Sequence, residues 1–307
     1  MPNFLRFFAV CLLGLALMAP PGYALAAEIA VVLSKRSETQ EAFVDALRNR
    51  LASPGAPRLI EAGMAGEALQ KSLLDQADAV IAVGAEAADA VAAQTASPIL
   101  AVLISQANLA ALHARHPKAR LGGMVLDQPV ARHLRLIRAT LPQVTRVGIL
   151  LGPQSATQRA ALAEAAAREG LKPAFAQVDD TAALLPALER LLDTNEAILA
   201  VPDATVFTTT TARPILLTSY RYRKPMFGYS QAYVSAGALA AVYSSPADVA
   251  EQTAAWLLEP GGRLTPPAAE APRRFSVSVN RHVARALGLE IPSDAALKHD
   301  IDKRGEK

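Results

Sequence analysis

The chain has 307 residues, of which 51% are hydrophobic and 19% are charged, and its formal net charge is +3. The apolar fraction supports a sizeable buried core. Lysine and arginine are scattered, with no long basic run beside short groups such as 35–36, 221–224 and 273–274, so we expect no nucleic-acid partner.

The first 26 residues have the three parts of an export signal. Arg6 supplies the positive start, an apolar run extends from Phe7 to Met18, and Ala24–Leu25–Ala26 is a small-residue cleavage site. The run has about a dozen residues, too few to span roughly 30 Å of hydrocarbon as a helix. We therefore expect a signal peptide at 1–26, cleaved near Ala26 or Ala27, and a periplasmic mature protein.

The only cysteine lies inside this signal. Val10 precedes Cys11 where lipid attachment requires a small residue, so we expect no lipid anchor. The mature chain then has no disulfide and no thiol chemistry. It retains about 280 residues, enough for two α/β lobes of ordinary size.

A first series of strands and helices begins directly after the signal. A buried-strand run at 29–33 precedes a helix whose apolar stripe is Phe43, Leu47 and Leu51. The unit then recurs. Continuously apolar strands separated by helices indicate a parallel sheet covered on both faces. Further strands are expected at 59–61, 79–83, 99–104 and 123–126.

A second series follows Asp127–Gln128–Pro129 and repeats the same architecture. The two series predict an α/β fold of two doubly wound, Rossmann-like lobes, with a ligand cleft between the carboxyl ends of their strands. The charged end, 298–307, is expected to be a frayed tail. Strands of the second series are expected at 147–151, 174–176, 197–201, 225–228, 239–242 and 275–279.

Three segments in the second half carry a resemblance to a known family: Pro214–Arg221, Pro225–Ser230 and Gly237–Ser244. They resemble a solute-binding family of ABC transporters that includes tryptophan- and tyrosine-type binders, and Val279–Asn280–Arg281 resembles the closing strand and helix of that family. The likeness is strong from about residue 195 to 290 and rests on element order from 28 to 194.

The resemblance implies a periplasmic-binding-protein type I fold with three crossovers and a hinge that closes on a small solute. By the same analogy, lobe one is 28–126 plus 245–262, and lobe two is 127–244 plus 263–297. The implied partners are a small-molecule solute and an ABC permease with its ATPase, and the protein is expected to be a monomer. An alternative is an extracytoplasmic receptor for a sensor or envelope complex, because either partner can detect lobe closure.

Ligand contacts in such a fold come from loops just past strand ends, where helix N-termini present free N–H groups. Asp203 is a candidate to receive a ligand ammonium, and Tyr229 and Tyr243 are candidates to stack on a ring. The nominated residues are Ser34, Gly84, Ala85 and Ser105 in lobe one, and Gln154, Ser155, Asp203, Thr205, Ser230 and Tyr243 in lobe two.

Each nominated side chain also has a structural interpretation. A Ser or Asp at a strand-to-helix junction is commonly an N-cap worth about 1 kcal/mol, and this is the favoured interpretation for Ser34, Ser105 and Ser155. For Asp203 both interpretations stand, and Tyr243 is compatible with a core position.

Two loops depart from the resembled family. Gly84–Ala85–Glu86–Ala87 stands where many relatives have Gly-Thr-x-Ala, and the first loop, 35–38, lacks a His-Pro-x-x-Asp pattern. Specificity for aromatic amino acids therefore does not carry over, and the solute stays unidentified.

An enzyme is the less favoured alternative. Gly228–Ala232 resembles the Gly-x-Ser-x-Gly elbow of serine hydrolases around Ser230, with Asp248 and His282 following in the expected order, but the second glycine is missing. His113 and His116 lack further metal ligands, and no glycine-rich phosphate loop is present. We therefore expect a binding protein with no catalysis, no metal and no cofactor.

Overall fold

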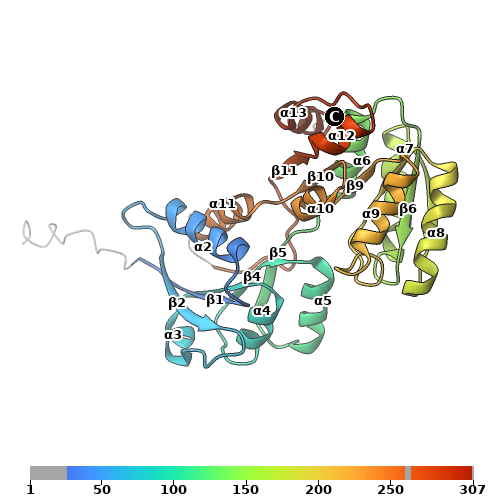
Figure 1. Ribbon diagram of the computed structural model, residues 1–307. Helices are drawn as coiled ribbons and strands as arrows, with labels where there is room; N and C mark the ends of the chain where they lie inside the picture. Colours follow the sequence, from blue (N-terminus) through green and yellow to red (C-terminus); the bar gives the residue numbers. More distant parts are fainter. Residues whose placement is uncertain (1–25, 260–263, 306–307) are drawn as a thin grey trace, which may run out of the picture.

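The computed structural model describes residues 26–259 and 264–305, which form two α/β lobes joined by three connections (Figure 1). The predicted signal peptide lies outside these ranges, apart from its last residue. Within them, no helix is both long and apolar enough to cross a membrane.

The N-terminal lobe is built on a five-stranded parallel sheet with the order β2-β1-β3-β4-β5. The inner strands β3 and β4 are continuously apolar because helices cover both faces, whereas the edge strand β2 has Arg58 and Glu61 exposed. The strands are β1 (Glu28–Leu33), β2 (Arg58–Met64), β3 (Ala79–Val83), β4 (Ile99–Ile104) and β5 (Leu121–Val125). The helices are α2 (Glu38–Arg50), α3 (Lys71–Gln76), α4 (Ala85–Ala92) and α5 (Gln106–Arg115).

Alternate residues of these strands point to opposite faces of the sheet. Ile29 and Val31 pack with α2 and with α11 (Pro246–Leu257), a helix from much later in the chain. Ala30 and Val32 pack on the other face with α4 and α5. The N-terminal lobe therefore takes one of its covering helices, α11, from beyond residue 245.

The C-terminal lobe is built on a six-stranded sheet with the order β11-β10-β9-β8-β6-β7. All its pairs are parallel except the edge pair of β10 and β11. The strands are β6 (Arg146–Leu151), β7 (Lys172–Gln177), β8 (Ala197–Leu199), β9 (Met226–Gly228), β10 (Ala240–Tyr243) and β11 (Ser276–Val279). The helices are α6 (Val130–Thr140), the 3₁₀ turn η1 (Ala156–Gln158), α7 (Arg159–Arg168), α8 (Thr181–Thr194), α9 (Ala212–Arg221), α10 (Gln231–Ala236), α12 (Arg281–Ala286) and α13 (Asp294–Gly305).

This second sheet is also covered on both faces. Val147 and Ile149 of β6 share a core with α6, α7 and α13, whereas Leu150 packs with α8, α9 and α10. The edge strand β11 reads Ser-Val-Ser-Val and buries only its valines. This alternation suits an antiparallel edge strand with one buried face.

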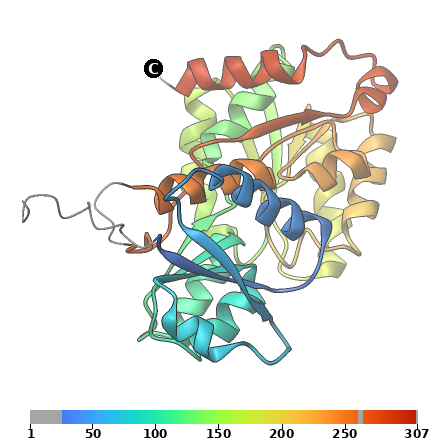
Figure 2. The same cartoon turned by 90° about the vertical axis from the view of Figure 1, so that its left-hand side faces the viewer.

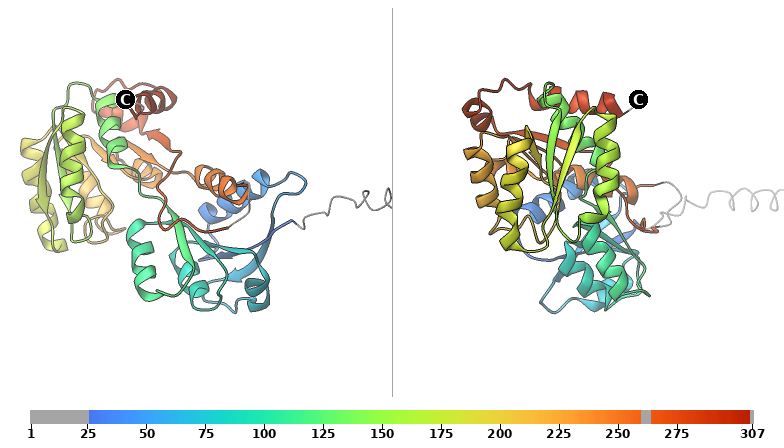
Figure 3. Two further views of the ribbon diagram at one scale, coloured as in Figure 1. Left: turned by 180° about the vertical axis from the view of Figure 1, so that it is seen from behind. Right: turned by 90° about the vertical axis from the view of Figure 1, so that its right-hand side faces the viewer.

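The three connections run side by side between the lobes (Figure 3). Their described residues are 126–129, 244–245 and 264–275. The last of these lies along β5: the Gly123 amide donates to the Pro267 carbonyl, and the Glu270 amide donates to the Gly123 carbonyl, both at 2.8 Å. Gly122 permits this approach, because a Cβ there would lie 2.1 Å from the Pro267 oxygen.

The expectation of a frayed tail from residue 298 is wrong. Residues 294–305 form helix α13, which packs beside α6 on the outer side of the C-terminal lobe (Figure 2). Leu297 and Ile301, four residues apart, are both 1% exposed, and the Lys298 ammonium lies 4.2 Å from the Phe275 ring centre. The many charges of this segment conceal a short apolar stripe that anchors the helix.

Candidate functional site

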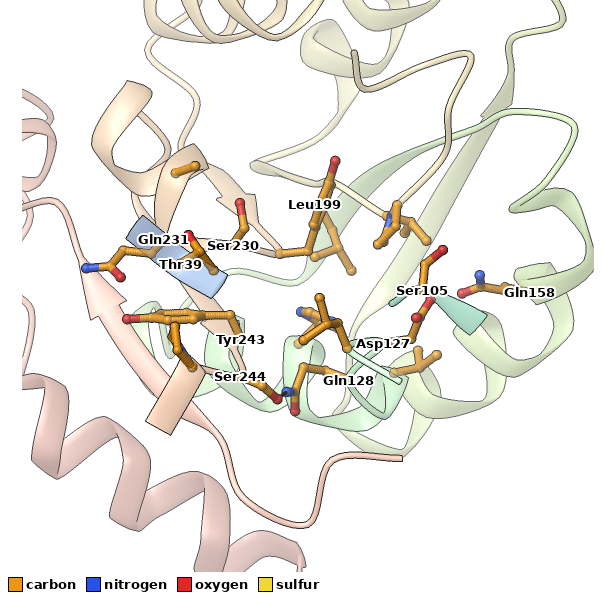
Figure 4. Close-up of a pocket in the computed structure, with 18 of the residues that line it drawn as sticks. Thr39, Ser105, Asp127, Gln128, Gln158, Leu199, Ser230, Gln231, Tyr243 and Ser244 are labelled. Carbon is orange, nitrogen blue, oxygen red and sulfur yellow. Dashed lines mark hydrogen bonds between the residues drawn. The ribbon is translucent and has the colours of Figure 1, made fainter. Parts of the chain in front are cut away.

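A cavity of about 570 Å³ lies between the lobes, a size typical of small-molecule sites (Figure 4). The N-terminal lobe contributes Glu38, Thr39, Ala42 and Ser105. The first two connections contribute Leu126, Asp127, Gln128 and Ser244, and the start of α11, which follows the second connection, contributes Pro246. The C-terminal lobe contributes Val130, His133, Gln158, Leu162, Leu199, Val201, Pro202, Tyr229, Ser230, Gln231, Ala232 and Tyr243.

Three of the ten nominated residues line this cavity. Ser105 and Ser230 are also N-caps: their Oγ atoms accept hydrogen bonds from the Asn108 amide at 3.2 Å and the Tyr233 amide at 3.3 Å. The third is Tyr243, at the end of β10, where burial and then the nearby carboxylates raise the pKa of its phenol. Capping and a place in the cavity wall thus coincide at both serines.

Ser34, Gly84 and Ala85 lie together but do not line the cavity. The Ser34 Oγ accepts a hydrogen bond from the Ala87 amide at 2.9 Å, so Ser34 caps α4 from the neighbouring strand. Gly84, the residue before α4, has φ +96°, and a Cβ there would lie 2.4 Å from the Ser34 Oγ. The capping interpretation of Ser34 is supported, although the helix it caps is not the next one in the chain.

Asp203, Gln154, Ser155 and Thr205 form a second group away from the cavity wall. One Asp203 oxygen accepts from the Gln154 amide (3.1 Å), the Ser155 amide (2.8 Å) and the Ser155 hydroxyl (2.9 Å). The other accepts from the Thr205 amide (2.9 Å) and the Val206 amide (3.4 Å). Because a carboxylate offers roughly four lone-pair positions, this one has no place left for a ligand ammonium.

The electrostatics agree with a structural role for Asp203. Its side chain is 4% exposed, and burial acts to raise its pKa, but hydrogen bonds from Ser155 and Thr205 outweigh burial and lower it. The carboxylate is therefore ionised in the folded protein and binds its own loops. Ser155, expected to be a helix cap, instead joins the loop after β6 to Asp203.

Among the cavity residues that sequence reasoning missed are Asp127 and His133. Asp127 immediately follows the strand expected at 123–126, so the rule that nominated the other loops also applies to it. Its Oδ2 accepts from the Gln106 amide at 2.7 Å. Burial raises the pKa of Asp127 against the effect of that hydrogen bond. His133 lies on the buried side of α6. The only sign of it in the sequence is that it is a polar residue among the apolar residues of that side.

His133 is neutral in the folded protein at pH 7. Burial, and then the charge of Arg132, lower the pKa of His133 from 6.5 to about 4. Its side chain lies in the cavity wall, the residue is 8% exposed, and its buried Nδ1 has no hydrogen-bond partner among the residues that the structure describes.

A hydrogen-bond network joins the three connections beside the cavity. The Gln128 Nε2 donates to the Ser244 Oγ at 2.7 Å, and Arg132 Nη1 donates to the Gln128 Oε1 at 2.9 Å. The same guanidinium donates to the carbonyls of Pro272, at 2.7 Å, and Arg273, at 3.2 Å. Two members, Gln128 and Ser244, also line the cavity, so a bound molecule would touch two of the connections between the lobes.

Residues 62–292 match the sequence model of a family described as ABC transporter substrate binding protein. The chain belongs to this family.

Solved structures that share the fold of this chain include three that are similar over most of its length. One is a conserved domain protein from Vibrio cholerae (21% identity, TM-score 0.59, covering 89% of this chain and 98% of the other). Another is an ABC domain from Streptococcus pneumoniae in complex with L-Trp (20%, TM-score 0.57, 88% and 98%).

The third is a ligand-free, open substrate-binding protein with adhesive properties from Clostridium difficile (17% identity, TM-score 0.66, covering 87% of this chain and 97% of the other). A comparison with curated proteins found no match. The predicted periplasmic-binding-protein type I fold and the resemblance to the solute-binding family are confirmed.

In this substrate-binding protein, the three residues of the hydrolase alternative have separate partners. Ser230 caps α10. Asp248 Oδ2 accepts from the Ser245 amide (2.9 Å) and from the hydroxyls of Ser245 and Ser276 (both 2.7 Å). His282 Nδ1 lies 2.9 Å from Arg285 Nη2. The geometry therefore gives no support to a Ser230 nucleophile.

Proposed function

We propose that this chain is the exported solute-binding component of an ABC importer, and that it binds a small solute in the cavity between its lobes. The observation that carries the proposal is the composition of the cavity wall, which includes both lobes and two of the three connections. A solute held there contacts every part that moves when the lobes close.

Closure then follows as a population shift. A solute favours the closed form only by the contacts that it gains there beyond those of the open form. The Arg132–Gln128–Ser244 network holds the connections in register, so the lobes turn as two bodies about them. In this proposal the permease and its ATPase recognise the closed form, and no chemical step or cofactor takes part.

Export is a separate part of the proposal. The apolar run from Phe7 to Met18 and the Ala24–Leu25–Ala26 site direct the chain across the membrane, and cleavage releases a periplasmic protein that acts as a monomer. Mass spectrometry of the periplasmic protein tests this. A mature N-terminus at Ala27 or Glu28 supports the proposal, and recovery of the intact chain from the cytoplasm contradicts it.

A thermal-shift screen of the periplasmic protein tests solute binding. The screen covers amino acids, small peptides, nucleosides, sugars, organic acids and organic amines. A solute at 100 times its dissociation constant adds about 2.7 kcal/mol of stability. Small-angle scattering with the same solute then measures closure as a decrease in the radius of gyration.

A matched pair of variants localises the binding. Ala42 is exposed on α2 and lines the cavity, so Ala42→Trp fills the cavity without disturbing the core. Ala167 is exposed on α7 and does not line it, so Ala167→Trp is the control. We expect the first variant to lose the solute-induced shift and the second to keep it. Loss in both, or in neither, would place the site elsewhere.

A further inference from the structure

The charged groups in the cavity wall are all acidic. Glu38 and Asp127 line it, and in the described part of the chain no lysine or arginine does. Arg132 is adjacent to His133 in sequence, but its guanidinium donates to Gln128 and to the Pro272 and Arg273 carbonyls of the third connection. The wall therefore has two carboxylates and no side-chain cation.

Three of the helices that begin at the cavity, α2, α5 and α11, already have acids at their positive ends, whereas α6 and α7 have none in their first turns. At α5, the Gln106 amide donates to Asp127. At α11, Asp248 accepts from the Ser245 amide, and Pro246 at the first helical position has no N–H. Glu38 is the first residue of α2. Since acids at helix N-termini compensate the helix dipole, the ends of α2, α5 and α11 have little attraction left for a carboxylate ligand.

Asp127 is the carboxylate placed to receive a cation. It is half-buried and, among the described residues, makes no ion pair. A half-buried charge without an oppositely charged partner is unfavourable. A ligand cation at this position would therefore gain the Coulomb attraction of a partly dry site. Asp127 lies near Ser105 and Gln158 at one end of the group drawn in Figure 4, whereas Gln231 and Tyr243 lie at the other.

The remainder of the wall suits an uncharged body. Leu162, Leu199 and Val201 give it an apolar side. His133, which is 8% exposed and has an unpartnered Nδ1, adds a polar group without a full charge. A solute with an ammonium group at Asp127 and an apolar body against these residues would contact both the acidic and the apolar parts of the wall.

We propose that the cavity selects organic amines, solutes that carry an ammonium group on an apolar body and no carboxylate, with Asp127 receiving the ammonium. This inference rests on the proposed solute-binding function and narrows its substrate class. An α-amino acid has the same ammonium, but its carboxylate meets Glu38 and Asp127 in a wall whose described residues include no lysine or arginine. Discrimination against it is therefore expected from this repulsion.

Isothermal titration calorimetry with matched compounds tests this substrate class. The first set shares a phenyl body: phenethylamine, L-phenylalanine, phenylpropionate and phenethyl alcohol. The second set is isoamylamine and L-leucine. We expect each amine to bind at least tenfold more tightly than its amino acid, with no measurable binding of phenylpropionate.

Two variants test the role of Asp127. Asp127→Asn is expected to weaken phenethylamine binding at least tenfold and to leave phenethyl alcohol unchanged. Gln158→Lys, at a half-buried position near Asp127 in Figure 4, supplies an internal cation and should have the same effect even if Asp127→Asn fails to fold. Asp45→Asn, an exposed carboxylate on α2 that pairs with Arg48, is the control and should bind like the parent.

The outcomes separate the two proposals. Tighter binding of an amino acid, phenylpropionate or a sugar than of either amine overturns the amine preference and leaves solute binding intact. Amine binding that is unchanged in both Asp127→Asn and Gln158→Lys also overturns it. If no compound of this set or of the wider screen binds, the inference and the proposed function fail together.

Discussion

The loops around Asp127 and Asp203 start from the same sequence feature and serve different purposes. Each aspartate follows a strand end of a parallel sheet, and each accepts hydrogen bonds from backbone amides. Asp203 is surrounded by five donors and is 4% exposed, whereas Asp127 has one inter-residue donor and lines the cavity. The comparison shows that the number of hydrogen-bond donors already bound to a carboxylate, rather than residue type or place in the fold, decides whether it is available to a ligand.

The largest expected effect follows from removing the saturated carboxylate. Asp203→Ala leaves four amides and a hydroxyl without their acceptor in a buried position, and we expect the free energy of unfolding to fall by about 4 kcal/mol. Urea denaturation measures it. Asp180→Ala is the control, because Asp180 is exposed and caps α8 through a single amide, so its loss should cost about 1 kcal/mol. Equal losses in the two variants would contradict the structural role of Asp203.

The second prediction concerns pH and His133, the buried histidine in the cavity wall. His133 has a pKa of about 4 when folded and 6.5 as its ordinary value, so below pH 6.5 the unfolded chain binds a proton that the folded chain refuses. The sign follows: stability decreases as the pH falls from 6.5 to 4, by about 3 kcal/mol from this residue.

Denaturation at a series of pH values measures the slope in the parent and in His133→Leu. We expect the variant to lose most of the slope in this window. The contribution of Asp203 has a different window, because its pKa is lowered: that stability is present above the usual pKa of 3.8 and is lost as the pH falls through the lower folded value. A slope above pH 4 that survives in His133→Leu would assign the titration to another group.

A smaller effect is expected at Ser155, which links Asp203 to the loop after β6. Its Oγ donates to Asp203 at 2.9 Å and accepts from the Gly152 amide at 2.9 Å, and the residue is fully buried. Ser155→Ala leaves the Gly152 amide unpaired, which should cost about 2 kcal/mol in urea denaturation. Ser105→Ala, the loss of a half-buried helix cap at the cavity, should cost about 1 kcal/mol. The reverse order would mean that Asp203 and Gly152 find other partners.

Sequence reasoning predicted what depends on short-range pattern. The continuous apolar runs at β1, β3 and β4 predicted a parallel sheet covered on both faces, and the serine before α5 predicted its cap. These features succeeded because a buried strand or a helix start imposes its residues locally.

The features that failed depend on contacts between distant segments. Asp203 has its donors mainly from residues 48 and 49 positions earlier in the chain, so its saturation is not visible around residue 203. Ser34 caps α4 rather than the helix after it, because β1 and β3 are neighbours in the sheet. The apolar stripe of Leu297 and Ile301 in α13 is short and lies among charged residues. Its burial becomes evident only when α13 is seen to pack on α6.

The smallest effect on stability is expected at Asp127, where the comparison is sharpest. Because burial raises the pKa of Asp127, the folded protein disfavours the charged form of this side chain. Neutralising Asp127 therefore removes an unfavourable contribution to the stability of the fold. Asp127→Asn keeps an oxygen for the Gln106 amide and removes the charge, and the free energy of unfolding should change by less than about 1 kcal/mol or rise slightly. Urea denaturation at pH 7 measures this change. A loss as large as that of Asp203→Ala would show that Asp127 is also committed to the fold, and a carboxylate so committed would not be free to bind a cation.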